Sequence, residues 1–83
     1  MNEIANEIVN KLKELGKTNI IFKVDKYGIM NFYYSPKHLK QPKLLRGCVE
    51  NNFKKDNKFY VGVEKMVAML KSDYDYAANF YKH

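Results

Sequence analysis

The chain has 83 residues, with 15 lysines and arginines against 9 aspartates and glutamates, so its formal net charge is +6. This length suits one domain over 1–83 whose core is too small to add a deep polar pocket, which favours a binding module over an enzyme. One cysteine excludes an internal disulfide framework and a cysteine-rich metal site. The first residues resemble no secretory leader, and the longest apolar run, 66–70, is too short to span a membrane, so we expect a cytoplasmic protein.

The N-terminal segment predicts an amphipathic helix over residues 3–15. Ile4, Ile8 and Leu12 recur every four residues, which places them on one face of a helix. Gly16 ends the pattern, since glycine commonly follows a last helical turn.

A β-hairpin is predicted over residues 18–35. Apolar and polar residues alternate in 20–24 and again in 29–34, as in strands with one buried face. Between them, 25–28 reads Asp-Lys-Tyr-Gly, a composition typical of tight turns. The alternation puts Met30, Phe32 and Tyr34 on one face of the second strand and Ile29, Asn31 and Tyr33 on the other.

The next segment predicts a loop followed by a helix. Both prolines lie in 36–43, and a helix does not run smoothly through Pro42. Residues 43–54 then carry apolar side chains at helical spacing, although Gly47 disfavours a helix there. Those apolar side chains are Leu44, Leu45, Cys48, Val49 and Phe53.

The C-terminal segment predicts a long helix that begins at residue 59 or 63 and ends near 82. Its apolar residues recur at alternating spacings of three and four, which would also suit a homodimer seam. Two alternatives stay open: a third strand near 58–62, and a helix break at Ser72–Asp73. The expected fold class is therefore α+β, in the order α-β-β-α-α, with the hairpin packed by the N-terminal helix and the long C-terminal helix. The apolar series is Tyr60, Val63, Val67, Leu70, Tyr74, Ala77 and Tyr81.

Positive charge is concentrated in residues 36–58, which carry seven bases, two acids and a net charge of +5. Such a cluster favours contact with nucleic acid, and His38, Tyr33 and Tyr34 lie beside it in sequence as candidates for stacking on bases. Because only one base in the whole chain is an arginine, we expect contact mainly with phosphates. The seven bases are Lys37, Lys40, Lys43, Arg46, Lys54, Lys55 and Lys58.

The alternative function is a small regulator or inhibitor that binds an acidic or nucleic-acid-handling protein. Lys, Asn, Tyr, Phe and Ile together supply 40 of the 83 residues, which indicates AT-rich coding DNA and suits a phage or other mobile element, including an anti-defence protein. Such a protein would dock through the same basic segment. Tyr76 and Phe80 are one helical turn apart and could anchor that interface.

Catalytic and metal chemistry find little support in the residue pattern. Cys48 sits among apolar residues, as a small buried side chain does. His38 could act as a general base in a small metal-independent ribonuclease, with Tyr81 and His83 as further candidates, but no spacing requires it. Two histidines 45 residues apart make no metal site, so we expect no enzyme, no metal and no cofactor.

Overall fold

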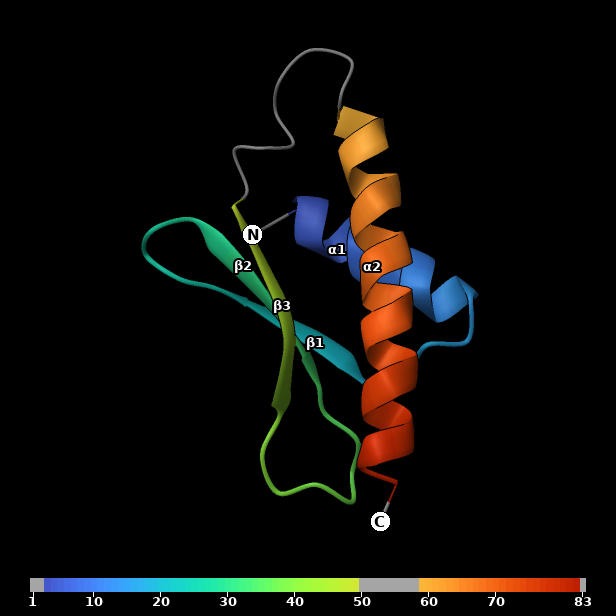
Figure 1. The fold of residues 1–83 in the computed structure, drawn as a ribbon. Coiled ribbons are helices and arrows are strands. Elements are labelled where there is room, and N and C mark those ends of the chain that lie inside the picture. Colours follow the sequence, from blue (N-terminus) through green and yellow to red (C-terminus); the bar gives the residue numbers. More distant parts are fainter. Residues whose placement is uncertain (1–2, 50–58, 83) are drawn as a thin grey trace.

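The computed structural model describes residues 3–49 and 59–82, which form two helices and a three-stranded sheet (Figure 1). The α+β class, the N-terminal helix, the hairpin and the long C-terminal helix are confirmed. In chain order the elements are α1 (Glu3–Glu14), β1 (Ile20–Val24), β2 (Ile29–Tyr34), β3 (Lys43–Val49) and α2 (Phe59–Phe80).

The hairpin of β1 and β2 has the predicted turn. Its register pairs Ile20 with Tyr34 and Val24 with Met30. The carboxylate of Asp25 accepts hydrogen bonds from the backbone N–H groups of Tyr27 (2.9 Å) and Ile29 (3.0 Å). Gly28 adopts a φ of 77°, a conformation that costs glycine nothing. The turn is therefore fixed by its own residues.

The third strand is β3, and the predicted helix over 43–54 is wrong for residues 43–49. β3 pairs antiparallel with β2, so the sheet order is β1-β2-β3. A β-bulge opposite Phe32 and Tyr33 lets Leu45 pack against the core while the neighbouring Leu44 remains exposed. This extra residue breaks the strand's two-residue alternation, which is why the segment resembled a helix. Residues 50–54 lie outside the described part of the chain.

The long helix α2 begins at Phe59, so the alternative of a third strand near 58–62 is wrong for residues 59–62. No break interrupts the helix at Ser72–Asp73. Its seam packs on the chain's own sheet and on α1, because Val63, Leu70 and Ala77 are buried there. That surface is therefore occupied by intramolecular contacts.

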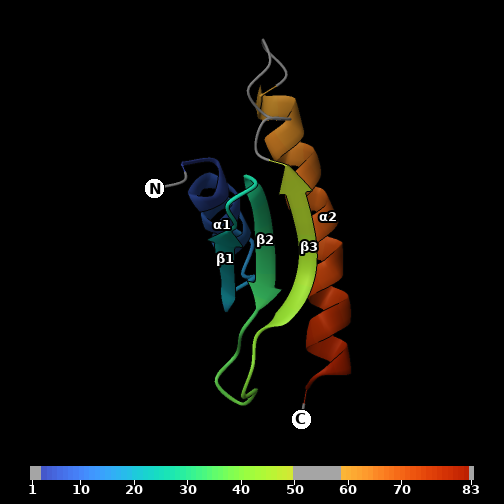
Figure 2. The ribbon, with the colours of Figure 1, turned by 90° about the vertical axis from the view of Figure 1, so that its left-hand side faces the viewer.

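Both helices cover the same face of the sheet, and the core lies between the two layers (Figures 1 and 2). Burial of these apolar side chains is the main stabilising term for so small a domain. No described helix is long and apolar enough to cross a bilayer. The largest fully buried side chains are Phe32, Ile8, Leu12, Met30, Leu70 and Val63.

Candidate functional site

The loop between β2 and β3 lies beside the C-terminal end of α2 (Figures 1 and 2). The ring nitrogen Nε2 of His38 donates a hydrogen bond of 2.6 Å to the backbone carbonyl of Tyr81. At the start of β3, the Nζ atom of Lys43 lies 5.4 Å from the centre of the Tyr81 ring, within range of a cation–π interaction. We call the surface formed by Lys37, His38, Lys40, Lys43, Tyr81 and Lys82 the cationic end.

Lys37, Lys40 and Lys43 of the cationic end have no acidic residue near them in sequence. Residues 35–49 contain four bases and no acid. Lys37 and Lys40 are exposed, and Lys43 is half-buried. Among residues 3–49 and 59–82, none of these three lysines takes part in a salt bridge. A polyanion can therefore approach them without displacing a carboxylate from the described part of the chain.

Arg46 has a different role from these lysines. Its Nε atom donates to Oδ2 of Asp73 at 2.7 Å, and Nη2 donates to Oδ1 at 3.3 Å. The hydrogen bond to Asp73 and the negative charge of that carboxylate raise the pKa of Arg46. This two-pronged ion pair links β3 to α2. Arg46 therefore adds no net charge to the surface for which it was predicted.

The two predicted stacking tyrosines of β2 point to opposite faces of the sheet. Tyr34 is buried, with 6% of its surface exposed, and its ring meets Tyr74 edge to face at 5.3 Å. Burial, followed by the neighbouring Tyr74, raises the pKa of its hydroxyl. Tyr33 is half-buried on the open face, where Nζ of Lys23 lies 5.5 Å from its ring centre. Tyr34 thus belongs to the core and offers no free ring face to a base.

Three aromatic rings follow one another along the end of α2. The rings of Tyr76 and Phe80 lie nearly parallel, 10° apart with centres separated by 6.1 Å, and Phe80 meets Tyr81 edge to face at 4.8 Å. Tyr76 is 72% exposed and Phe80 is 66% exposed. Both side chains are therefore accessible to a partner, and they are continuous with the cationic end through Tyr81.

A groove of about 450 Å³ separates β3 from α2 beside these rings. We call it the β3–α2 groove. Its lining includes Lys43 and Tyr81 of the cationic end and the Arg46-bound carboxylate of Asp73. Apolar carbon and aromatic rings supply much of the remaining wall. The lining residues are Lys43, Leu44, Leu45, Ser72, Asp73, Tyr76, Ala77 and Tyr81.

Sequence reasoning missed part of this site. Tyr81 was expected on the apolar seam, but it follows the end of α2, is half-buried and contacts both His38 and Lys43. Leu44 and Lys82 carried no signal beyond residue type. The predicted contacts Lys54, Lys55 and Lys58, and the candidate His83, lie outside the described residues.

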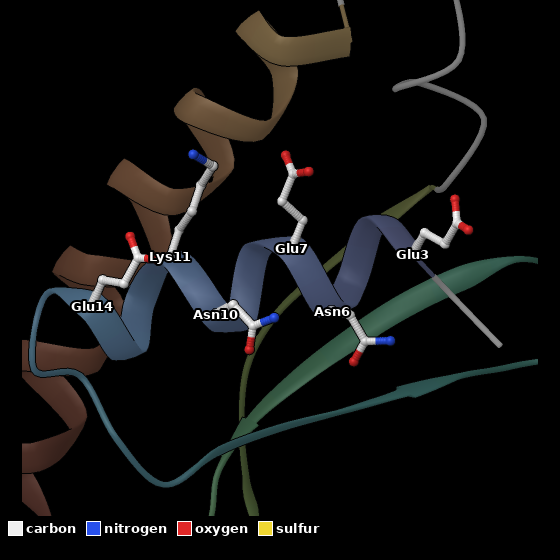
Figure 3. A pocket seen from close by; sticks show the side chains of 6 residues that line it. All are labelled: Glu3, Asn6, Glu7, Asn10, Lys11 and Glu14. Carbon is white, nitrogen blue, oxygen red and sulfur yellow. The ribbon is translucent and has the colours of Figure 1, made fainter.

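The outer face of α1 forms a second shallow hollow, of about 460 Å³ (Figure 3). Figure 3 shows Glu7 and Lys11 extending to the side of α2, while Asn6 and Asn10 point the other way. Lys11 lies 3.6 Å from a carboxylate oxygen of Glu64 on α2. The hollow is therefore acidic, with one lysine that is already paired. Its lining residues are Glu3, Asn6, Glu7, Asn10, Lys11 and Glu14.

Neither hollow shows a metal centre or a nucleophile–base pair. Within the described ranges, no three side chains of His, Cys, Asp or Glu gather closely enough to hold a metal ion. Cys48 is half-buried and packs against the core, as its apolar surroundings predicted, although on a strand. His38 is engaged with the Tyr81 carbonyl.

No protein family model, curated protein or solved structure matches this chain. Its function therefore has to be inferred from the chemistry of its own surfaces.

Proposed function

We propose that this protein binds nucleic acid through the cationic end, mainly through phosphate contacts and without catalysing a reaction. One observation carries the proposal: Lys37 and Lys40 in the β2–β3 loop and Lys43 at the start of β3 have no carboxylate partner among the described residues, and Lys43 lies against Tyr81, whose ring meets the exposed Phe80. Unpaired ammonium groups attract a polyanion over a Debye length of about 8–10 Å and release its counterions on binding.

The neighbouring carboxylates of α2 support this assignment because other bases neutralise them. Asp73 is held by Arg46, and Asp75 accepts a 2.7 Å hydrogen bond from Nζ of Lys17. Both acids are thereby prevented from cancelling the charge of the loop. The positive potential of the cationic end is thus preserved by ion pairs made elsewhere on the same helix.

The type of basic side chain also indicates which part of the nucleic acid is contacted. Arginine recognises guanine through a two-pronged contact, whereas lysine acts as a point charge. The guanidinium group of Arg46, the single arginine, already donates two hydrogen bonds to Asp73. The remaining lysines suit phosphates, so we expect affinity that depends strongly on salt and little on sequence.

Fluorescence anisotropy with labelled oligonucleotides tests the proposal. Between about 50 and about 200 mM salt, the logarithm of the binding constant should fall linearly with the logarithm of salt concentration, with a slope of about −2 if three lysines each contact a phosphate of a single strand. Absence of binding at low salt, or a slope near zero, would overturn the proposal and favour the alternative of an acidic protein partner. Incubation of the protein with RNA and a chelator should leave the RNA intact, whereas cleavage would contradict a role without catalysis.

A further inference from the structure

We propose that the β3–α2 groove receives the bases of single-stranded nucleic acid, an inference that rests on the proposed function and narrows it to unpaired strands. Phosphates would lie along Lys37, Lys40 and Lys43, and bases would turn into the groove toward Tyr76. The groove and the cationic end share Lys43 and Tyr81, so a single strand could meet both at once.

The exposed rings provide the first argument. Tyr76 and Phe80 lie nearly parallel and remain mostly uncovered, so a flat face is open to a further ring. Bases stack on aromatic side chains irrespective of sequence, because every base has a π-face. Large uncovered aromatic surface is costly in water, and a base would cover it.

The walls of the groove provide the second argument. Leu44 lines the groove and is 61% exposed, and Leu45 and Ala77 add apolar carbon. The lining side chains also carry polar groups: the ammonium of Lys43, the hydroxyls of Ser72, Tyr76 and Tyr81, and the carboxylate of Asp73, which Arg46 already holds. None of the side chains without a partner there is an amide or guanidinium that could hold a base edge by two hydrogen bonds, so the groove should accept bases without strong selection among them.

The positive charge beside the groove favours single-stranded nucleic acid over an apolar peptide as its occupant. Lys43 lines the groove, and the adjoining loop adds Lys37 and Lys40 with no acid among them. An occupant that combines flat rings with regularly spaced anions fits such a surface. A duplex offers the anions but keeps the faces of its bases stacked inside, and exposing a base costs energy. The lysines would therefore bind either form, whereas the groove would favour the single strand.

The test compares labelled single strands of about 12 nucleotides, a length within the range of single-strand binding sites, with duplexes of equal length. Thymidine and uridine homopolymers serve as the single strands because they form little structure of their own. The unmodified protein should bind single strands at least about tenfold more tightly than duplex. Preference for the single strand in either the DNA or the RNA arm supports the inference, and the difference between the two arms identifies the sugar that is preferred.

The variant Tyr76→Ala/Phe80→Ala removes the open rings and leaves the lysines in place. Its affinity for single strands should fall about tenfold or more, while its affinity for duplex and its salt slope stay unchanged. Tyr27→Ala is the matched control, because Tyr27 is 74% exposed but lies in the β1–β2 turn. Since all three rings are exposed, the helical circular dichroism signal should be retained in both variants.

The possible failures are distinguishable. If neither single strands nor duplex bind in a salt-dependent manner, the proposed function itself is overturned. If both bind equally, or if Tyr76→Ala/Phe80→Ala binds single strands as tightly as Tyr27→Ala does, only the role of the groove is overturned. Equal loss of affinity for both forms in the double variant would also overturn it, since the rings would then act on the fold of the cationic end.

Discussion

The outer face of α1 and the β3–α2 groove are hollows of similar size, about 460 and about 450 Å³, but they differ in chemistry. The α1 hollow carries three carboxylates and one lysine, and Lys11 is paired with Glu64. The groove adjoins lysines that form no ion pair with the described residues, together with uncovered aromatic rings. Shape alone therefore does not identify the site, whereas uncompensated charge next to exposed apolar surface does.

The two surfaces also differ in how the chain builds them. The α1 hollow is the solvent side of one amphipathic helix, where polar residues are expected in any case. The cationic end needs the β2–β3 loop, the start of β3 and the end of α2, which come from separate parts of the sequence. The hydrogen bond from His38 to Tyr81 joins residues 43 positions apart. Only the second surface is assembled from segments that are distant in sequence.

The largest expected effect comes from reversing charge at the cationic end. Lys37→Glu/Lys40→Glu should lower affinity for single strands at least about tenfold and make the salt slope shallower by about 1.4, because two phosphate contacts are lost. The matched control is Lys13→Glu/Lys71→Glu, which makes the same change of charge at exposed positions on α1 and α2. Anisotropy titrations should show a far smaller loss for the control, and equal losses would mean that net charge alone drives binding.

Part of this comparison could be read from the sequence. Two-residue alternation predicted the hairpin, and spacings of three and four residues predicted both helices. β3 could not be predicted in this way, because its bulge moves Leu45 to the core side and imitates helical spacing with Cys48. A bulge depends on the partner strand, which local periodicity does not include.

The candidate site shows the same limit. Residue type predicted that Lys37 and Lys40 would be cationic, but it could not show that Arg46 is neutralised by a residue 27 positions away. Adjacency in sequence suggested that Tyr33 and Tyr34 act together, whereas the pleat of β2 sends them to opposite faces. The sequence shows which side chains are charged or aromatic, but only the fold shows which of them are left accessible to a partner.

The Arg46–Asp73 pair provides the next largest effect. Asp73→Asn removes the carboxylate charge and leaves the half-buried Arg46 without its counterion, which should lower the free energy of unfolding by about 1 kcal/mol. The freed guanidinium should at the same time strengthen binding to single strands. Urea denaturation and anisotropy measure the two effects.

Arg46→Met is the companion variant, because it removes the cation and keeps most of the apolar side chain. It leaves the Asp73 carboxylate unpaired, so it should also lower the free energy of unfolding, but it should not gain affinity for single strands. If Asp73→Asn binds no better than the unmodified protein does, Arg46 does not face the bound strand.

A smaller effect is expected at the α1 hollow. Glu3→Lys/Glu14→Lys removes two negative charges from this surface and adds two positive ones, yet affinity for single strands should rise less than about threefold near physiological salt, because charges beyond a Debye length are largely screened. Anisotropy near 150 mM salt, about the physiological value, measures this change. A gain as large as the loss in Lys37→Glu/Lys40→Glu would show that α1 also contacts the strand, and the contrast between the two hollows would fail.

The smallest expected effect tests whether the side chain of Tyr34 belongs to the core rather than to the binding surface. Burial raises the pKa of its hydroxyl above the ordinary value of 10.0, so the unfolded chain loses this proton first as pH rises. The contribution of the protonated Tyr34 hydroxyl to the free energy of unfolding is fully present below pH 10. It is lost as pH rises from 10 through the pKa of Tyr34 in the folded state. Urea denaturation between about pH 8 and about pH 11 should show a shallower decline in Tyr34→Phe than in the unmodified protein.

Tyr33→Phe is the matched control for this measurement, because it removes a hydroxyl from the opposite face of the same strand. It should keep the alkaline decline that Tyr34→Phe reduces. If the two variants decline equally, Tyr34 ionises as freely in the folded protein as in the unfolded chain. Its ring would then have to be reached by solvent, and it would return as a candidate for stacking beside His38. A shallower decline in Tyr34→Phe alone assigns Tyr34 to the core and leaves Tyr76 and Phe80 as the stacking surface.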